Sequence, residues 1–84
     1  MKNKQTLPEW FDGELYEEGA TVQNRFSGEE AELTATELSM YDFVMGASIM
    51  IEMGMSNPST VKSLRKGLDW FRENNSKAYM TLLD

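Results

Sequence analysis

Residues 38–55 constrain the fold of this chain most, because they predict one helix with apolar side chains on every side. Twelve of these eighteen residues are apolar, only Asp42 and Glu52 are charged, and five of the chain's seven methionines lie here. At about 100° per residue, two apolar sets fill opposite halves of the helix: Met40, Phe43, Val44, Ala47 and Ile51, and Tyr41, Met45, Ile49 and Met53. A helix of this kind must be covered on two sides or lie in lipid.

The same segment is the candidate membrane span, but its composition argues against one. It contains two acids, small or polar residues near its middle, and no flanking Lys or Arg. A spanning helix needs about twenty predominantly apolar residues and tolerates central acids poorly. We therefore expect a soluble protein without a membrane partner. Because so short a chain buries only about 60–65% of its unfolded surface, we expect a second copy to cover the helix, in a dimer as the simplest homo-oligomer.

The chain contains neither histidine nor cysteine. This excludes the usual general base near neutral pH, a thiolate nucleophile, disulfides and the common structural zinc sites. The acids at 17–18 and 29–32 lack the spacing of a calcium loop, and the six glycines are too scattered for a phosphate loop. We therefore expect no enzyme, no cofactor and no metal.

Charge divides the chain into an acidic and a basic region. Residues 9–37 carry a net charge of −8, and residues 62–77 carry +3. The two regions are either two solvated faces or complementary surfaces that meet across a subunit contact. A helix-turn-helix over 36–73 would suit a small nucleic-acid-associated regulator, but the acidic surface would repel phosphates, so a nucleic-acid partner is not expected.

We expect residues 1–5 to form a mobile tail, followed by a short turn. Residues 6–9 have the T-x-x-E spacing of a capping box, so one helical turn can run to Asp12. Trp10 and Phe11 then either close one end of the core or form an exposed anchor for another protein.

From Gly19 the pattern alternates, and residues 19–33 predict a β-hairpin. Its predicted loop is the two-residue Ser27-Gly28, with Gly28 at positive φ. That loop sets a register in which two pairs face each other: Arg25 with Glu30, and Val22 with Leu33.

Start and stop signals divide the rest of the chain into helices. The spacing Thr34-x-x-Glu37 is a second capping box that starts the apolar helix, and Gly54 either ends that helix or opens its last turn. Asn57-Pro58 starts an amphipathic helix. Its apolar stripe consists of Val61, Leu64, Leu68 and Phe71. A break at residues 74–76 caps a short terminal helix.

Trp70 falls nearly opposite that stripe. Either the returning C-terminal residues Tyr79, Leu82 and Leu83 cover it, or it is an anchor for a partner. Arg65 and Asp69 are spaced as an i,i+4 ion pair.

Together these patterns predict one α+β domain over residues 1–84: a short N-terminal turn, one β-hairpin at 19–33, and a helical part over 35–83 with a long apolar helix, an amphipathic helix and a short C-terminal helix. The candidate interaction residues are Met40, Val44, Ala47, Ile51, Met55, Trp70, Trp10 and Phe11. The predicted function is a non-enzymatic, self-associating protein-interaction module.

Two stretches resemble a known group of proteins: LPEWFDGELYEEGATVQNRFSGE and KGLDWFRENNSKAYMTLLD. They are similar to small uncharacterised proteins of tailed phages of marine bacteria, especially T4-like cyanophages, and the resemblance covers most of residues 7–84. It implies a phage accessory factor that acts on a host protein in the bacterial cytoplasm, or a virion structural component. It implies no activity and no site residues.

Overall fold

The computed structural model describes residues 6–11, 13–24, 26–55 and 57–83 of the chain. In these ranges a two-stranded antiparallel hairpin precedes three helices, which confirms the predicted α+β class. The elements are β1 (Ala20–Gln23), β2 (Glu30–Leu33), α1 (Ala35–Glu52), α2 (Pro58–Asn74) and α3 (Ser76–Leu82). The expected mobile tail at 1–5 lies outside the described residues.

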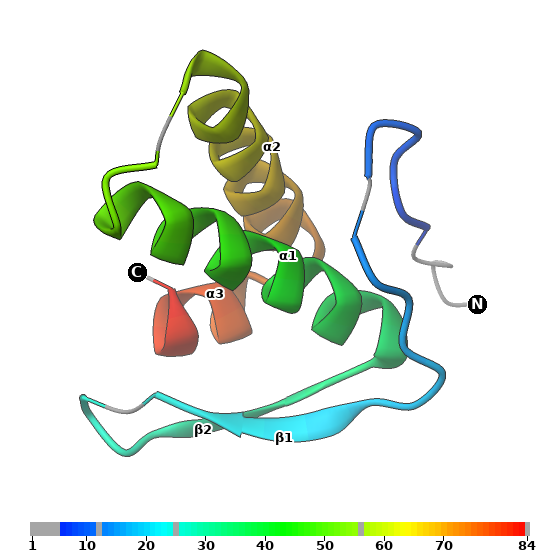
Figure 1. The fold of residues 1–84 in the computed structure, drawn as a ribbon. Coiled ribbons are helices and arrows are strands. Elements are labelled where there is room, and N and C mark those ends of the chain that lie inside the picture. The colour runs from blue at the N-terminus through cyan, green and yellow to red at the C-terminus, as the bar shows by residue number, and fades with distance from the viewer. Residues whose placement is uncertain (1–5, 12, 25, 56, 84) are drawn as a thin grey trace.

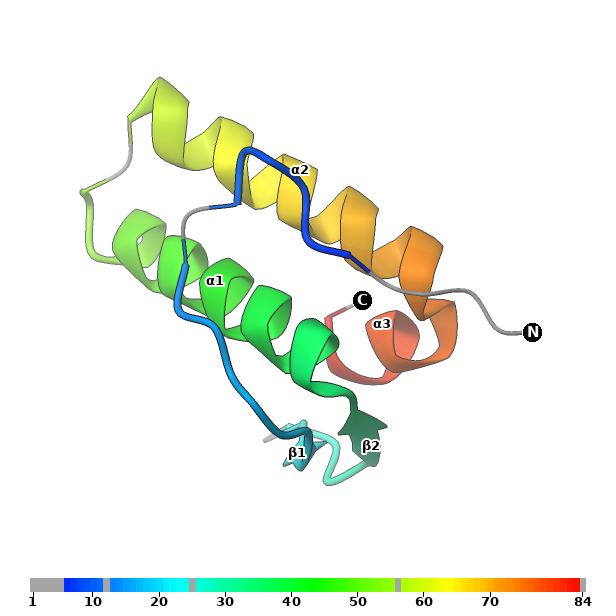
Figure 2. The same ribbon diagram turned by 90° about the vertical axis from the view of Figure 1, so that its right-hand side faces the viewer.

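The helices α1 and α2 pack against each other as a helical hairpin (Figure 1), and α3 turns back to contact both α2 and β2. The β-hairpin runs beneath α1 and α3. Residues 6–11, which we call the strap, lie along α2 on the side away from α3 (Figure 2). The core therefore lies between α1 and α2 and is closed below by α3 and β2.

The predicted helix boundaries follow from their caps. The Thr34 hydroxyl accepts a hydrogen bond from the Glu37 N–H at 3.1 Å, and the Glu37 carboxylate accepts one from the Thr34 N–H at 3.0 Å. This confirms the capping box that starts α1. The Asn57 side chain accepts a hydrogen bond from the Thr60 N–H at 2.9 Å and caps α2, which begins at Pro58 as predicted.

The end of α1 is a Schellman motif. Gly54 has a φ of +80° and donates its N–H to the Ile51 carbonyl, and the Met55 N–H bonds to the Met50 carbonyl. The predicted stop at Gly54 is confirmed. A residue with a side chain would be strained at this φ, so glycine fixes the point where the chain leaves α1.

The hairpin is present, but the predicted register is wrong by two residues. Val22 pairs with Ala31 rather than Leu33, and the Asn24 N–H bonds to the Glu29 carbonyl at 2.8 Å. The loop therefore lies between Asn24 and Glu29, and Gly28 has the predicted positive φ, +83°. The Asn24 carboxamide oxygen accepts hydrogen bonds from two loop N–H groups, at 2.8 and 3.2 Å, which stabilises the longer loop. Arg25 lies outside the described residues.

The buried apolar core consists of Leu33, Met40, Val44, Trp70, Phe71 and Ala78. The two long helices approach closely at Gly67, where a built Cβ would lie 2.7 Å from the Val44 Cγ2. Phe71 is fully buried at the inner end of the predicted stripe, whereas Val61 at its outer end is exposed. Asp69 pairs with Arg72 at 2.6 Å, so the predicted Arg65–Asp69 ion pair is wrong.

The strap contacts Trp70, a covering segment that neither alternative for this residue had named. The Trp70 indole N–H donates a hydrogen bond to the Thr6 carbonyl at 3.1 Å. A single turn, closed by the Phe11 N–H and the Pro8 carbonyl, takes the place of the predicted helical turn. The Phe11 ring lies 5.2 Å from the Phe43 ring, so the strap also contacts α1. The two aromatic residues of the strap thus close one side of the core.

The expectation that α1 is apolar on every side is not confirmed. Asp42, Gly46 and Glu52 are exposed along its length, while Met40 and Val44 are buried on the opposite side. In the part of the chain that the structure describes, no helix has the length and apolar character needed to span a membrane.

Candidate protein interaction surface

Most of the interaction residues predicted from the sequence belong to the core of a single chain. Met40 and Val44 are almost fully buried, and Trp70 is 9% exposed. The half-buried members are Ala47, Ile51, Trp10 and Phe11. Met55 alone among the eight predicted residues is exposed, at 55%. A surface site for another protein must therefore use mainly other residues.

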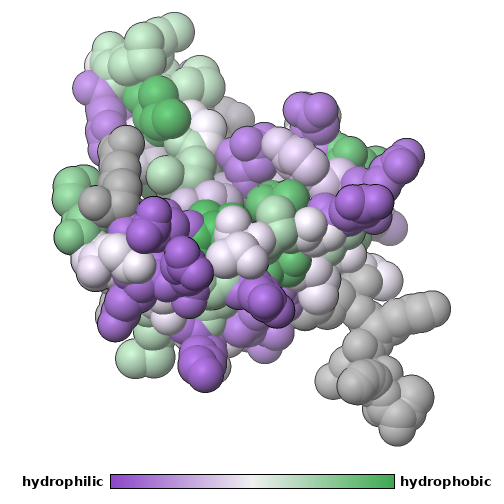
Figure 3. Space-filling model, turned by 90° about the horizontal axis from the view of Figure 1, so that it is seen from below, coloured by the Kyte–Doolittle hydropathy of each residue, from purple (hydrophilic) through white to green (hydrophobic). Residues whose placement is uncertain are grey.

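Exposed apolar side chains gather instead where α1 ends and α2 begins. We call this surface the apolar tip; its members and their exposed fractions are Ile49 (48%), Met50 (40%), Met53 (67%), Met55 (55%) and Val61 (37%). Figure 1 shows this end of α1 and its connection to α2 at the upper left. From below, hydrophilic residues cover much of the molecule, and a hydrophobic protrusion stands on the side where α1 ends (Figure 3).

The apolar tip arises because the covering elements do not reach it. The strap contacts α1 at Phe43, and the hairpin joins α1 at Leu33, near its first turn. Residues 49–55 extend beyond both contacts, and the Schellman motif holds Met53 and Met55 at the surface. The signal in the sequence was the group of methionines after Gly46: Met50, Met53 and Met55. The helical wheel placed apolar residues on two opposite sides of this helix, but it did not show which side the rest of the chain would cover.

A shallow hollow separates the two long helices next to the apolar tip. It has a volume of about 330 Å³. Its lining residues are Asp42, Phe43, Gly46, Ala47, Met50, Ser59, Thr60 and Ser63. A Cβ built at Gly46 would meet no atom within 4 Å outside its own helix, among the described residues. Gly46 therefore faces open space within one chain.

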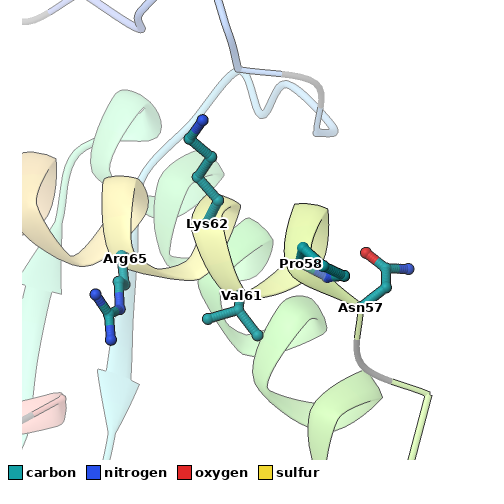
Figure 4. A pocket seen from close by; sticks show the side chains of 5 residues that line it. All are labelled: Asn57, Pro58, Val61, Lys62 and Arg65. Atoms are coloured by element: carbon teal, nitrogen blue, oxygen red, sulfur yellow. The ribbon is translucent and has the colours of Figure 1, made fainter.

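The outer side of α2 adds a positively charged border. A second hollow, of about 590 Å³, is lined by Asn57, Pro58, Val61, Lys62 and Arg65. In Figure 4, Lys62 extends in the direction opposite to Val61 and Arg65 lies beside Val61, so two cations line the same hollow as this apolar side chain. The first turn of α2 carries no acidic residue, and its N-terminal end contributes further partial positive charge.

An acidic segment, residues 14–18, lies next to the N-terminal end of α1. The Tyr16 N–H donates a hydrogen bond to the Ser39 hydroxyl at 3.0 Å, and the Ser39 hydroxyl bonds in turn to the Ala35 carbonyl. Ser39 is almost fully buried, so this contact anchors the segment. Leu15 points outward and is 69% exposed between Glu14 and the following acids.

Negative charge around this segment changes the titration of its tyrosine. Desolvation of the ring raises the pKa of the Tyr16 hydroxyl above its ordinary value. The nearby carboxylates of Asp42 and Glu14 raise that pKa further, and Asp42 also accepts a hydrogen bond from the hydroxyl. The segment is therefore a strongly negative surface that contains an exposed leucine.

The described residues bring together no three His, Asp, Glu or Cys side chains that could hold a metal ion. Comparisons with protein-family models, curated proteins and solved structures found no match to this chain. The arrangement of exposed groups is thus the basis on which a function can be argued.

Proposed function

We propose that this chain is a non-enzymatic, self-associating protein-interaction module, and that the apolar tip is its contact surface. The observation that carries the proposal is the exposure of five large apolar side chains at one end of the helical hairpin. Contiguous apolar surface on a soluble domain is typical of a protein contact. Full burial of a Met, Ile or Val side chain contributes about 1.5–3 kcal/mol, so covering the tip supplies a driving force for association.

The type of side chain also supports a protein contact rather than a small-molecule site. Methionine is flexible and polarisable, and it adapts to the shape of an apolar partner. Three of the five residues of the apolar tip are methionines. The two hollows beside them are shallow, whereas small-molecule sites are typically deep enough to bury most of their ligand.

The resemblance to phage proteins supports a setting for this module. In this proposal the chain is a phage accessory factor that acts in the cytoplasm of a bacterial host, where its assembled form binds a host protein. A virion component would differ in assembling into large polymers rather than discrete oligomers, so the same mass measurement separates the two roles.

The test is a solution mass measurement by light scattering across the micromolar range. The parent chain should form a discrete oligomer, and the double variant Met53→Gln, Met55→Gln should need about tenfold more protein to associate. Met80→Gln is the matched control, because Met80 is 66% exposed but lies on α3, away from the apolar tip. A parent that is monomeric at every concentration, or a control that weakens association as much as the double variant, would refute the proposal.

A further inference from the structure

We propose that the chain associates head to tail, so that the apolar tip of one copy binds the acidic segment 14–18 of a second copy. The inference rests on the proposed self-association and names the surface that meets the tip. The simplest alternative is a symmetric dimer in which two tips face each other. Charge on both surfaces distinguishes the two arrangements.

The basic border of the tip disfavours the symmetric arrangement. Lys62 and Arg65 line the same hollow as Val61 on the outer side of α2 (Figure 4). In a two-fold contact through this side, the same cations of both copies would meet near the axis and repel each other. Glu52, an acid at the end of α1, lines a different hollow with Phe26 and Met45 on the hairpin side, so it does not neutralise this border.

The acidic segment is complementary to that border in both charge and polarity. It presents an exposed apolar side chain, Leu15, with Glu14 on one side and Glu17 and Glu18 on the other. The tip presents Val61, which shares its hollow with the cations Lys62 and Arg65. Leucine against valine, with carboxylates against Lys62 and Arg65, buries apolar surface and pairs the charges at the rim.

The segment is also held in place before any partner binds. Its anchor is the hydrogen bond from the Tyr16 N–H to the buried Ser39 hydroxyl on α1. A segment fixed in this way loses less conformational freedom on binding than a free arm would. Its exposed side chains are thus presented on a defined backbone.

Within one molecule the two surfaces cannot meet. The apolar tip lies where α1 ends, whereas the segment runs beside the N-terminal end of α1, on the opposite side of the molecule (Figure 1). The contact must therefore form between copies. A head-to-tail contact produces a ring when its rotation closes and a filament when it does not.

The loop of the β-hairpin is the competing acidic surface. Phe26 there is 89% exposed and precedes Glu29 and Glu30. However, Phe26 borders a hollow of its own chain beside Tyr41 and Leu82, and the sequence places the cation Arg25 directly before it. The hairpin loop is therefore less negative than segment 14–18 and provides a charge-matched control.

Two charge-reversed variants test the inference. The first is Lys62→Glu with Arg65→Glu, and the second is Glu17→Lys with Glu18→Lys. All four side chains are exposed, so both variants should fold, which circular dichroism checks. Light scattering should show each variant associating about ten- to hundredfold more weakly than the parent when alone. An equimolar mixture should associate as the parent does, with the two variants alternating, because each surface of one variant finds an oppositely charged surface on the other.

Two further chains complete the test. A chain that carries all four reversals should associate as the parent does, and Glu29→Lys with Glu30→Lys should leave association unchanged. The head-to-tail arrangement is refuted if the parent associates and the Glu17, Glu18 variant associates equally well. It is also refuted if the hairpin variant alone loses association. Either result leaves the proposed function standing. Failure of the mixture to associate more strongly than either variant alone also overturns the head-to-tail arrangement. A parent that never associates overturns both.

Discussion

Two glycines in the helical hairpin should respond in opposite ways to the same substitution, alanine for glycine. Gly46 lies in α1 and Gly67 in α2, and both are inside their helices. Alanine is favoured over glycine in a helix interior by about 1 kcal/mol. Replacement of either residue therefore brings the same gain in helix propensity, and any difference in the outcome reports the space around the new methyl group.

The structure gives that space directly. At Gly46 a Cβ meets no atom within 4 Å beyond its own helix, so Gly46→Ala should raise the free energy of unfolding by about 1 kcal/mol. At Gly67 the Cβ would lie 2.7 Å from the Val44 Cγ2 and 3.4 Å from the Met40 Sδ. Both of these neighbours are almost fully buried and cannot move into solvent. Overpacking of this kind costs about 1–3 kcal/mol, which offsets or exceeds the gain.

The assay is urea unfolding followed by far-ultraviolet circular dichroism, at protein concentrations low enough to keep the chain monomeric. Gly46→Ala should be more stable than Gly67→Ala by about 1–3 kcal/mol, the overpacking cost at Gly67. Equal changes in both variants would refute the close approach of the helices at Gly67. If Gly46→Ala instead destabilises the chain only where it is associated, the second copy occupies the hollow beside Gly46.

Three further outcomes are expected. Trp70→Phe removes the hydrogen bond to the Thr6 carbonyl and should lower the free energy of unfolding by about 1–3 kcal/mol in urea; an unchanged value would mean that the strap is not docked. Gly28→Val places a β-branched residue at a φ of +83° and should destabilise by about 1–2 kcal/mol in the same assay. Asp42→Asn should lower the pKa of the Tyr16 hydroxyl in an absorbance titration. Because that pKa is raised in the folded state, stability should fall as the pH rises through it, and by less in Asp42→Asn.

Local signals predicted the helices well because their causes are local. The capping box at Thr34, the Asn57-Pro58 start and the glycine stop at Gly54 each involve residues within one or two turns. The hairpin was predicted for the same reason, but its register was not. The Asn24 side chain bonds to two N–H groups of the loop, and this choice of loop shifts every pair by two residues. A shift by two keeps each side chain on its predicted face.

The surface could not be predicted in the same way, because burial depends on which distant segments cover a helix. Met40 and Val44 were predicted as contact residues and are core residues, since α2 covers them at Gly67. Trp70 looked unprotected on a helical wheel, yet Thr6, 64 residues away, accepts its hydrogen bond. No spacing in the sequence connects these two residues.

That same contact sets an order for folding during synthesis. The strap leaves the ribosome first, but its docking surface on α2 follows about 60 residues later, which corresponds to roughly 3–12 s at ordinary rates of translation. During that interval the strap can contact only α1, through Phe43, and its side that docks on α2 is uncovered. The side of the strap that docks on α2 is thus exposed until that helix is made, so a chaperone that acts on this chain co-translationally should meet the strap before α2.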